Sequence, residues 1–286
     1  MSEVTLIGLG AMGSAIAQTL LDNQCDLTVW NRSSKKVEPL VELGASSTAS
    51  LKQAIESSPV VLICIHGYEA TRALLDDPEI IAALPGRTII QMSTGTPAQA
   101  RAAEAWINER GGNYLDCSIM VYPQDVGEST GQVLVSGPQE TYQECSRYIN
   151  YLGGDIRYLG STIGAAATLD LAVVTRLAVI TVGVVYGAHI CESEGVPLQQ
   201  FADMYAEGER PHTLAMTIAK SDFDQNISAT VGTSIEVFSA IQNLANDLGI
   251  NTELPDFILG LYQRADQAGY RKQDNAALIK VFREAR

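Results

Sequence analysis

Three glycines with fixed spacing, Gly8, Gly10 and Gly13, stand near the start of the chain. They follow the apolar run Val4–Ile7, which predicts a strand, and they open the stretch Ala11–Asp22, which predicts a helix. In this context the first glycine permits a tight turn, the second lets the backbone approach a pyrophosphate, and the third lets helix and strand pack closely. The phosphates would then lie at the helix N-terminus, where free N–H groups favour anions. The predicted cofactor contacts are Gly8, Leu9, Gly10, Ala11, Met12 and Gly13.

Strand and helix patterns alternate through the first half of the chain. Short apolar runs, typical of strands covered on both faces, occur at Leu27–Trp30, Val60–Ile65 and Thr88–Met92. Helices are expected near Lys36–Leu43 and Pro97–Arg110, with further short strands near Asn113–Asp116 and Gln132–Ser136. This alternation predicts an α/β Rossmann domain with a doubly wound parallel sheet. A glycine-rich turn without a ligand is the alternative interpretation of the motif.

The pattern changes after about residue 160, where strand signals stop. A chain of 286 residues is long enough for two domains. We expect an NADP-binding Rossmann domain over 1–161, a long interdomain helix over 162–191, and an all-helical dimerisation and substrate domain over 192–286. Helical segments are predicted near Pro197–Tyr205, Thr213–Ser221, Val231–Leu248 and Pro255–Ala268.

The segment Gly164–Ile190 is apolar over a length that could span a membrane. Asp170, Arg176 and His189 interrupt it, and a charge in the middle of a bilayer is costly. We therefore expect no membrane span, and a helix buried in a large core or in a subunit interface.

The residues after the second predicted strand bear on which dinucleotide is bound. An enzyme that uses NAD usually has Asp or Glu here, to accept a hydrogen bond from the ribose 2′-hydroxyl. This chain has Asn31, Arg32 and Ser33 instead, with Lys36 on the following segment. A guanidinium makes a two-pronged hydrogen bond with a phosphate, so this set predicts NADPH. The alternative is that Arg32 is an ordinary surface arginine.

Composition excludes several other classes. The formal net charge is -14, and no cluster of basic residues is larger than Lys35–Lys36, so a nucleic-acid partner is not expected. The five cysteines form no CxxC pair and the three histidines are dispersed, so no metal site is expected. An odd number of cysteines and the absence of a basic, apolar leader predict a cytoplasmic location.

Several motifs resemble one known superfamily, and the resemblance runs through essentially the whole chain. They are Ile7–Gly13, Trp30–Ser33, Ser93–Pro97, Ile119–Pro123 and Gly164–Ala172. Together they resemble the β-hydroxyacid dehydrogenase superfamily, and within it the imine reductases and reductive aminases most.

Asp170 is the position on which the expected chemistry depends. The resemblance implies a lysine here in the hydroxyacid dehydrogenases, followed four residues later by asparagine, whereas this chain has Asp170 and Val174. In imine reductases the position is commonly aspartate. Apolar neighbours should raise the pKa of Asp170, which suits a proton donor near neutral pH, and its carboxylate could equally stabilise an iminium ion. A structural carboxylate paired with Arg176 or with the backbone is the alternative.

The resemblance also implies further site residues. Ser93 and Thr94 match positions that line the nicotinamide pocket, although both could be ordinary turn residues. The implied substrate pocket contains Met120, Val121, Tyr122, Val174 and Ala178. Relatives that perform reductive amination often have a tyrosine where this chain has Ala178, which leaves amination open.

The resulting hypothesis is an NADPH-dependent reductase of C=N bonds that converts cyclic imines or iminium ions to amines. A hydroxyacid or carbonyl dehydrogenase that uses NADP, or a non-catalytic NADP-binding protein, are the alternatives. The resemblance implies a domain-swapped homodimer in which helices of one subunit complete the cleft of the other. The apolar segment Leu171–Val185 favours such an interface.

Overall fold

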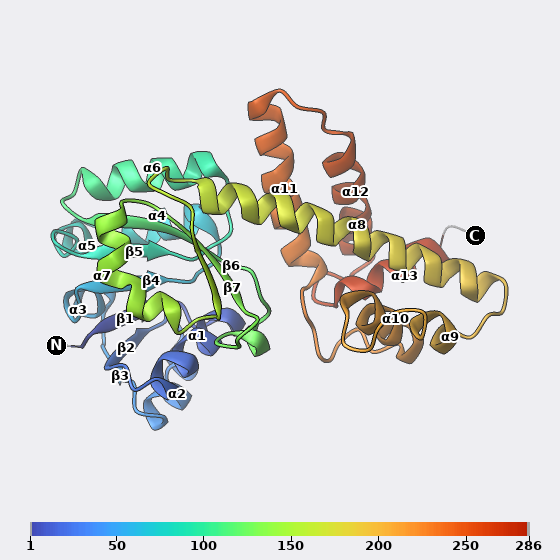
Figure 1. Ribbon diagram of the computed structural model, residues 1–286, viewed down its shortest axis with the longest axis horizontal. Helices are drawn as coiled ribbons and strands as arrows, with labels where there is room; N and C mark the ends of the chain where they lie inside the picture. Colours follow the sequence, from blue (N-terminus) through green and yellow to red (C-terminus); the bar gives the residue numbers. More distant parts are fainter. Residues whose placement is uncertain (1, 285–286) are drawn as a thin grey trace. The chain divides into compact units, whose positions relative to one another are not determined.

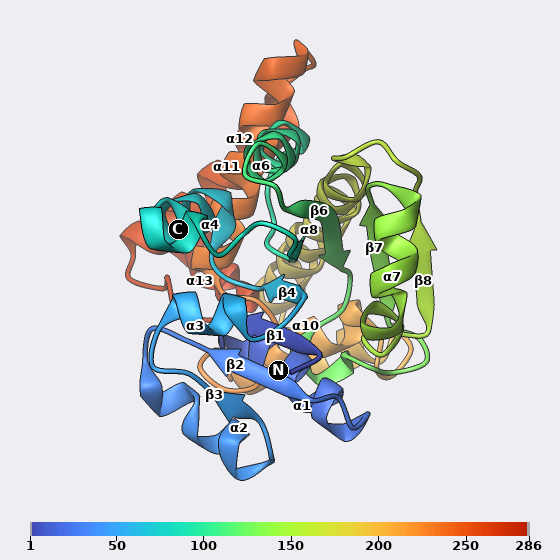
Figure 2. The same cartoon turned by 90° about the vertical axis from the view of Figure 1, so that its left-hand side faces the viewer.

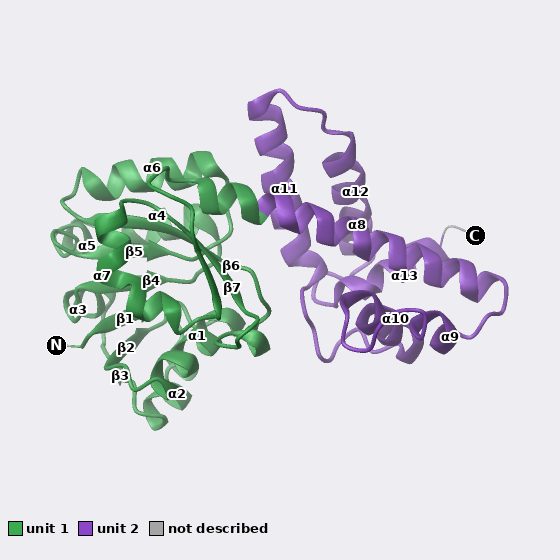
Figure 3. Cartoon of the chain, in the orientation of Figure 1, with its two compact units in different colours: residues 1–170 green, residues 171–286 purple. Residues whose placement is uncertain are grey.

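The computed structural model describes residues 2–284 (Figure 1). The chain divides into two compact units, residues 1–170 and residues 171–286, and helix α8 belongs to both (Figure 3). The first unit carries the β-sheet and the second is built from helices.

The sheet of the first unit has eight strands within the described residues, in the order β3-β2-β1-β4-β5-β6-β7-β8. Every neighbouring pair is parallel except β6 and β7. The strands are β1 (Val4–Ile7), β2 (Leu27–Trp30), β3 (Ser46–Ser47), β4 (Val60–Ile63), β5 (Thr88–Gln91), β6 (Asn113–Ile119), β7 (Gln132–Ser136) and β8 (Asp155–Tyr158).

Helices cover both faces of this sheet (Figure 2). Alternate residues of each buried strand point to opposite faces, so both faces are apolar and each packs against its own group of helices. In β4, for example, Leu62 packs with α1, α2 and α7, whereas Val61 packs with α3 to α6. The first group is α1 (Ala11–Asp22), α2 (Glu38–Glu42) and α7 (Gln139–Asn150). The second is α3 (Leu51–Glu56), α4 (Gly67–Leu75), α5 (Pro78–Ile81) and α6 (Pro97–Asn108). Short 3₁₀ turns occupy Ser34–Lys36 and Pro123–Asp125.

Local sequence sets the start of α6. Thr96 accepts a hydrogen bond from the Gln99 backbone N–H at 3.2 Å, and the Gln99 side chain accepts one from the Thr96 N–H at 2.8 Å. This capping box, with Pro97 in the first turn, satisfies donors that a helix start otherwise leaves unpaired. The helix therefore begins directly after the loop that follows β5.

The second unit contains α8 (Ala165–Ser193), α9 (Leu198–Ala202), α10 (Arg210–Lys220), α11 (Val231–Leu248), α12 (Glu253–Gln267) and α13 (Leu278–Arg283), with a 3₁₀ turn at Asn275–Ala277. Its core is apolar and includes the stacked rings of Phe238 and Tyr262, whose centroids lie 6.0 Å apart. A bidentate ion pair between Glu192 and Arg283 ties the end of α8 to α13. This pair fixes the C-terminal helix against the long one.

Helix α8 is, within residues 2–284, the helix long and apolar enough to cross a membrane by length and composition. Its most apolar window has a mean hydropathy of 1.9, and only 33% of that window is buried. Leu171, Val185 and Ala188 pack into the core of the second unit. A remaining apolar face, which includes Tyr186 and Ile190, is exposed.

The predicted fold class is confirmed: a Rossmann domain with helices on both faces of its sheet precedes a helical part. The sheet is not parallel throughout, however. The connection from β6 to β7 contains no crossover α-helix, so β7 runs antiparallel to β6. Short elements such as α4 and the half-exposed edge strand β8 were not predicted, because α4 buries only Tyr68, Thr71 and Leu75, one of them polar, and β8 has no buried residue.

Candidate functional site

The carboxyl ends of β1, β4, β5 and β6 meet at one edge of the sheet, because these strands are mutually parallel. Ligands of doubly wound sheets bind outside this edge. The Gly8–Gly13 turn follows β1, and the Ser93–Thr94 segment follows β5. The Ser93 hydroxyl donates a hydrogen bond to the carbonyl of Ile65 at 2.7 Å, which joins the loops after β5 and β4. The structure thus brings both predicted cofactor segments to one edge.

Each of the three positions in the first turn requires glycine for a different structural reason. A side chain at Gly8, whose φ is +96°, would meet the Cys64 carbonyl oxygen at 2.4 Å. A side chain at Gly13 would meet the Gly8 oxygen at 2.0 Å, so this glycine permits the contact between helix and strand. A side chain at Gly10 would meet nothing within 4 Å. Gly10 therefore borders open space, which is the fit that a closely approaching pyrophosphate requires.

The N-terminus of α1 opens onto the same space. Gly10 is its N-cap, and in the described part of the chain no side chain caps the helix or places a carboxylate in its first turn. The free N–H groups and the helix dipole favour an anion there. This turn can hold the phosphates of a dinucleotide, which would supply a transferable hydride when bound.

The end of β2 forms the adjoining part of the site. Asn31 accepts a hydrogen bond from the Leu9 N–H at 3.1 Å and donates one to the Ser33 carbonyl at 3.0 Å, so it links the two loops. A cavity of about 610 Å³ lies beside it. Its polar lining comprises Asn31, Arg32, Ser34, Glu38, Glu42, Ser47 and Thr48. The predicted contacts Ser33 and Lys36 are exposed and do not line this cavity, whereas the hydroxyl of Ser34 does. The roles of Ser33 and Lys36 in cofactor binding stay predictions.

Asp116 lies inside β6, buried, where the sequence suggested a strand end. Its carboxylate accepts four hydrogen bonds: from the Tyr68 hydroxyl at 3.2 Å, the Ser136 hydroxyl at 3.1 Å, and the backbone N–H groups of Gly164 at 3.1 Å and Ala167 at 3.3 Å. Burial raises the pKa of Asp116, and these four donors oppose that rise. The carboxylate thereby anchors the first turn of α8 to the sheet.

Asp170 is one turn further along α8 and is the last residue of the first unit. Its side chain is buried, and burial, reinforced by the negative charge of Asp116, raises the pKa of Asp170 to about 7. Among residues 2–284 no ion pair joins Asp170 to Arg176, which is exposed. The carboxyl group can therefore exchange a proton near neutral pH.

The remaining predicted residues fall into two sets. Met120, Val121 and Tyr122 are half-buried in the loop after β6, whose carboxyl end lies at the same edge as Gly8. Thr94 is exposed beside Ser93. Val174 and Ala178 belong to the second unit, and both pack in its apolar core. They follow Asp170 by four and eight residues along the chain, and their role in a substrate pocket stays a prediction.

Sequence reasoning missed the role of Asp116. Its signal was present, because a carboxylate stands among the apolar and aromatic residues Tyr114–Cys117 of a buried strand. Buried charges are expected to have partners. Those partners come from positions 20 to 51 residues away, so no local pattern identifies them.

Three known proteins are similar to this chain over nearly their whole length. An NADPH-dependent reductive aminase of Aspergillus oryzae is 28% identical, covering 98% of this chain and 97% of the relative. An NAD-dependent L-serine dehydrogenase of Pseudomonas aeruginosa is 24% identical, covering 99% and 98%. The structure of an imine reductase from Myxococcus stipitatus in complex with NADP+ is 28% identical, with a TM-score of 0.69 and coverage of 97% and 99%.

The glycine geometry predicts opposite behaviour for two alanine variants. Gly10→Ala should keep the parental melting temperature, since its methyl group meets open space, but should weaken NADP+ binding about tenfold or more, or about 1.4 kcal/mol. Gly13→Ala should lower the melting temperature as well, because its methyl group would overlap the Gly8 carbonyl. Calorimetric titration and thermal denaturation measure both quantities. Unchanged affinity in folded Gly10→Ala would contradict the assignment.

Because the pKa of Asp170 is raised, replacing Asp170 with a neutral residue should stabilise the folded protein by an amount that depends on pH. Between the ordinary value of 3.8 and about 7, the unfolded chain releases this proton while the folded chain retains it, so stability falls as pH rises. The difference in unfolding free energy between Asp170→Asn and the parent should therefore increase from pH 4 to pH 8, by at most about 4 kcal/mol. Urea denaturation at both pH values measures it, and a pH-independent difference would refute the shift.

The site geometry agrees with a domain match that covers more than half of the chain. The NAD-binding domain of 6-phosphogluconate dehydrogenase matches residues 3–160, which contain the glycine turn, the β2 end and the loop after β5. The chain therefore belongs to the family of the NAD-binding domain of 6-phosphogluconate dehydrogenase, as an NAD(P)-binding member of an oxidoreductase family that also contains imine reductases and reductive aminases.

Proposed function

We propose that this protein reduces C=N bonds of cyclic imines or iminium ions with NADPH. The observation that carries the proposal is Asp170, a buried carboxyl group with a pKa of about 7 at a position where the resembling hydroxyacid dehydrogenases have lysine. A lysine would repel a positively charged iminium ion, whereas a carboxylate attracts it. The similarity to a reductive aminase and an imine reductase supports the same reaction.

Asp170 can perform both electrostatic tasks that this reaction requires. Because its pKa lies near neutral pH, a substantial fraction of the protein carries the protonated carboxyl group that an imine nitrogen needs as donor. Proton transfer to nitrogen leaves the Asp170 carboxylate beside the iminium ion. A nicotinamide dinucleotide, when bound, would supply the hydride that the iminium carbon accepts. The apolar surroundings strengthen the attraction between carboxylate and iminium.

Loss of the titratable group should therefore remove turnover without removing the cofactor. Asp170→Asn is close to isosteric, but it can neither release a proton nor carry a charge. Its kcat on 2-methyl-1-pyrroline should fall roughly 10²- to 10⁴-fold. NADPH affinity, followed by fluorescence, should stay within about twofold. Asp203→Asn, at an exposed position, is the matched control. Undiminished turnover in Asp170→Asn would assign the chemistry to other residues.

A carbonyl dehydrogenase is the second candidate, favoured by the similarity to an L-serine dehydrogenase. The same absorbance assay separates the candidates when small hydroxyacids and NADP+ replace imine and NADPH. A ketone with an amine tests reductive amination in the same format. Turnover of none of these substrates would favour a non-catalytic cofactor-binding protein.

The preference for NADPH is supported by the cavity at the end of β2. Arg32 lines it together with Asn31 and Ser34, so a guanidinium and a hydroxyl are available to a 2′-phosphate. Glu38 and Glu42 line the same cavity, so Arg32 is the basic side chain that would offset their charge there.

Arg32→Ala should separate the two cofactors. The KM for NADPH should rise about tenfold or more, as expected for a lost charge-assisted hydrogen bond, while the KM for NADH changes little. Lys36→Ala should have a smaller effect, because Lys36 does not line the cavity. Initial rates with both cofactors measure these values. Equal changes for NADPH and NADH in Arg32→Ala would refute the role of Arg32.

We also propose a homodimer, since the second unit exposes several large apolar side chains. Tyr186 and Ile190 on α8 are 52% and 53% exposed, and Phe257 on α12 is 57% exposed. Tyr186 and Ile190 lie one turn apart on α8, and apolar side chains left exposed on neighbouring turns of a helix commonly mark an interface; a second copy is the partner that the family resemblance implies. Light scattering at micromolar concentration measures the assembly.

A further inference from the structure

Two buried side chains of the sheet hold the first turn of α8. Asp116 on β6 and Ser136 on β7 stand directly opposite each other in the antiparallel pair, so their side chains lie on the same face of the sheet. Asp116 accepts hydrogen bonds from the N–H groups of Gly164 and Ala167 at 3.1 and 3.3 Å. Ser136 accepts one from the Ala166 N–H at 3.3 Å and donates its own proton to Asp116 at 3.1 Å. The cross-strand pair thus supplies acceptors for N–H groups that have no partner inside the helix.

This anchor lies one helical turn before Asp170. Ala167 precedes Asp170 by three residues, which is a rise of about 4.5 Å along an α-helix. Side chains of a helix lean toward its N-terminus, which brings the Asp170 carboxyl group back toward the turn that Asp116 holds. Both carboxyl groups are buried in the first unit. The position of Asp170 relative to the sheet is therefore set by the pair Asp116 and Ser136.

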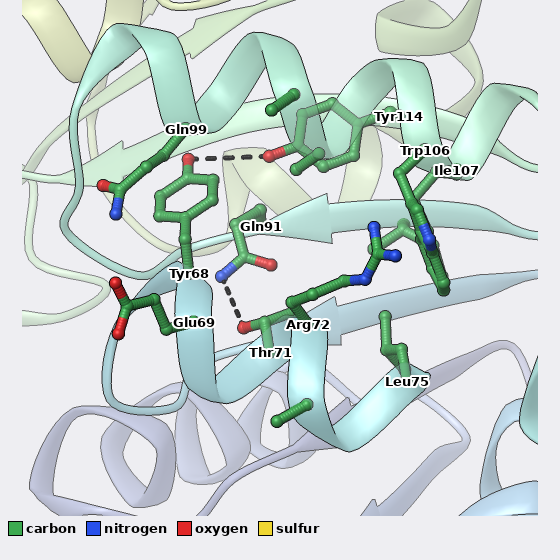
Figure 4. Close-up of a pocket in the computed structure, with 14 residues that line it drawn as sticks. Tyr68, Glu69, Thr71, Arg72, Leu75, Gln91, Gln99, Trp106, Ile107 and Tyr114 are labelled. Atoms are coloured by element: carbon green, nitrogen blue, oxygen red, sulfur yellow. Dashed lines mark hydrogen bonds between the residues drawn. The ribbon is translucent and has the colours of Figure 1, made fainter. Parts of the chain in front are cut away.

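The Asp116 carboxylate is a negative charge among groups that are neutral at pH 7. The Tyr68 hydroxyl donates to it, and the Tyr114 hydroxyl donates in turn to that of Tyr68 at 3.5 Å (Figure 4). Burial raises the pKa of both tyrosines and of the adjoining Cys117 thiol above their usual values, so all three keep their protons. Both tyrosine rings line a cavity of about 370 Å³ between α4 and α6. The helix N-terminus and the four donors favour the charged form of Asp116.

This charge acts directly on Asp170. Burial raises the pKa of Asp170 most, and the negative charge of Asp116 raises it further. Within the part of the chain that the structure describes, Asp116 is the charged group that acts on the pKa of Asp170. Arg176 on α8 is exposed, and Glu104 on α6 acts on Tyr114 instead. Position and charge thus reach Asp170 from the same side chain.

We propose that Asp116 and Ser136 are positioning residues for Asp170: the pair holds the proton donor in place, and the charge of Asp116 sets the pH range in which the donor is protonated. Neither side chain is assigned a contact with substrate. The inference rests on the proposed imine reduction for its kinetic readout, but its effect on Asp170 is measurable without turnover.

The first test removes the charge and keeps an acceptor. Asp116→Asn leaves an oxygen for the N–H groups of α8, so the titration of Asp170 should move to lower pH by about half a unit or more. Since the protonated form donates, the fall of kcat with rising pH should move the same way. Carboxyl ¹³C NMR of the NADP+-loaded protein, with the signal assigned by its absence in Asp170→Asn, measures the titration. Asp26→Asn, at an exposed position of the first unit, should change neither.

The second test removes an acceptor and keeps the charge. Ser136→Ala frees the Ala166 N–H, so kcat should fall about fivefold or more through misplacement of Asp170, with the KM for imine within about twofold. The titration of Asp170 should move by less than about 0.2 unit, because Asp116 remains charged. This variant keeps the proposal testable if Asp116→Asn does not fold, which thermal denaturation checks.

The outcomes separate this proposal from the proposed function. A smaller shift of the Asp170 titration in folded Asp116→Asn, or a shift to higher pH, would overturn the role of the Asp116 charge. Undiminished kcat in Ser136→Ala would overturn the positioning. If the parent protein reduces no imine, the proposed function is wrong, whereas the NMR titration still decides whether Asp116 controls the proton of Asp170.

Discussion

The buried carboxylate of Asp116 is the interaction on which the arrangement of the first unit depends. One of its oxygens accepts hydrogen bonds from the backbone N–H groups of Gly164 and Ala167, and so holds the start of α8 against β6. The other accepts from Tyr68 on α4. A strand, a helix start and a neighbouring helix are thus joined through one side chain. Since desolvating a carboxylate is costly, this junction requires all its donors.

Burial, together with the negative charge of this carboxylate, raises the pKa of Asp170. Asp116 is satisfied by four donors that favour its charged form, whereas no hydrogen bond within the described residues involves the carboxyl group of Asp170. Burial and the nearby negative charge therefore act on Asp170 without opposition, and its pKa rises to about 7. Two carboxylates in one unit acquire different roles because their environments differ. One organises the fold, and the other is available for proton transfer.

Tyr68 links this centre to the cavity between α4 and α6. Its hydroxyl donates to Asp116, and its ring lines the cavity that Gln91 also lines. The Tyr114 hydroxyl lies 3.5 Å from that of Tyr68 and lines the cavity too. Two buried polar groups, the Asp116 carboxylate and the Gln91 amide, therefore lie close together on one face of the sheet and differ in their hydrogen bonding. The Asp116 carboxylate is fully partnered, and the Gln91 amide oxygen has no partner among the described residues.

The sequence alone determined the fold class, the nucleotide turn and the candidate proton donor. Gly8, Gly10 and Gly13 between an apolar strand and a helix have a local steric logic, so they could be recognised without the rest of the chain. Only the tertiary structure decided what depends on distant residues. Ser34, and not Ser33, lines the cavity at the end of β2, and β7 runs antiparallel to β6. Asp116 is surrounded by hydrogen-bond donors from α4, β7 and the start of α8. The cavity lining, the direction of β7 and the partners of Asp116 all depend on burial and hydrogen bonding between residues far apart in the chain. Neither can be read from the spacing of neighbouring residues.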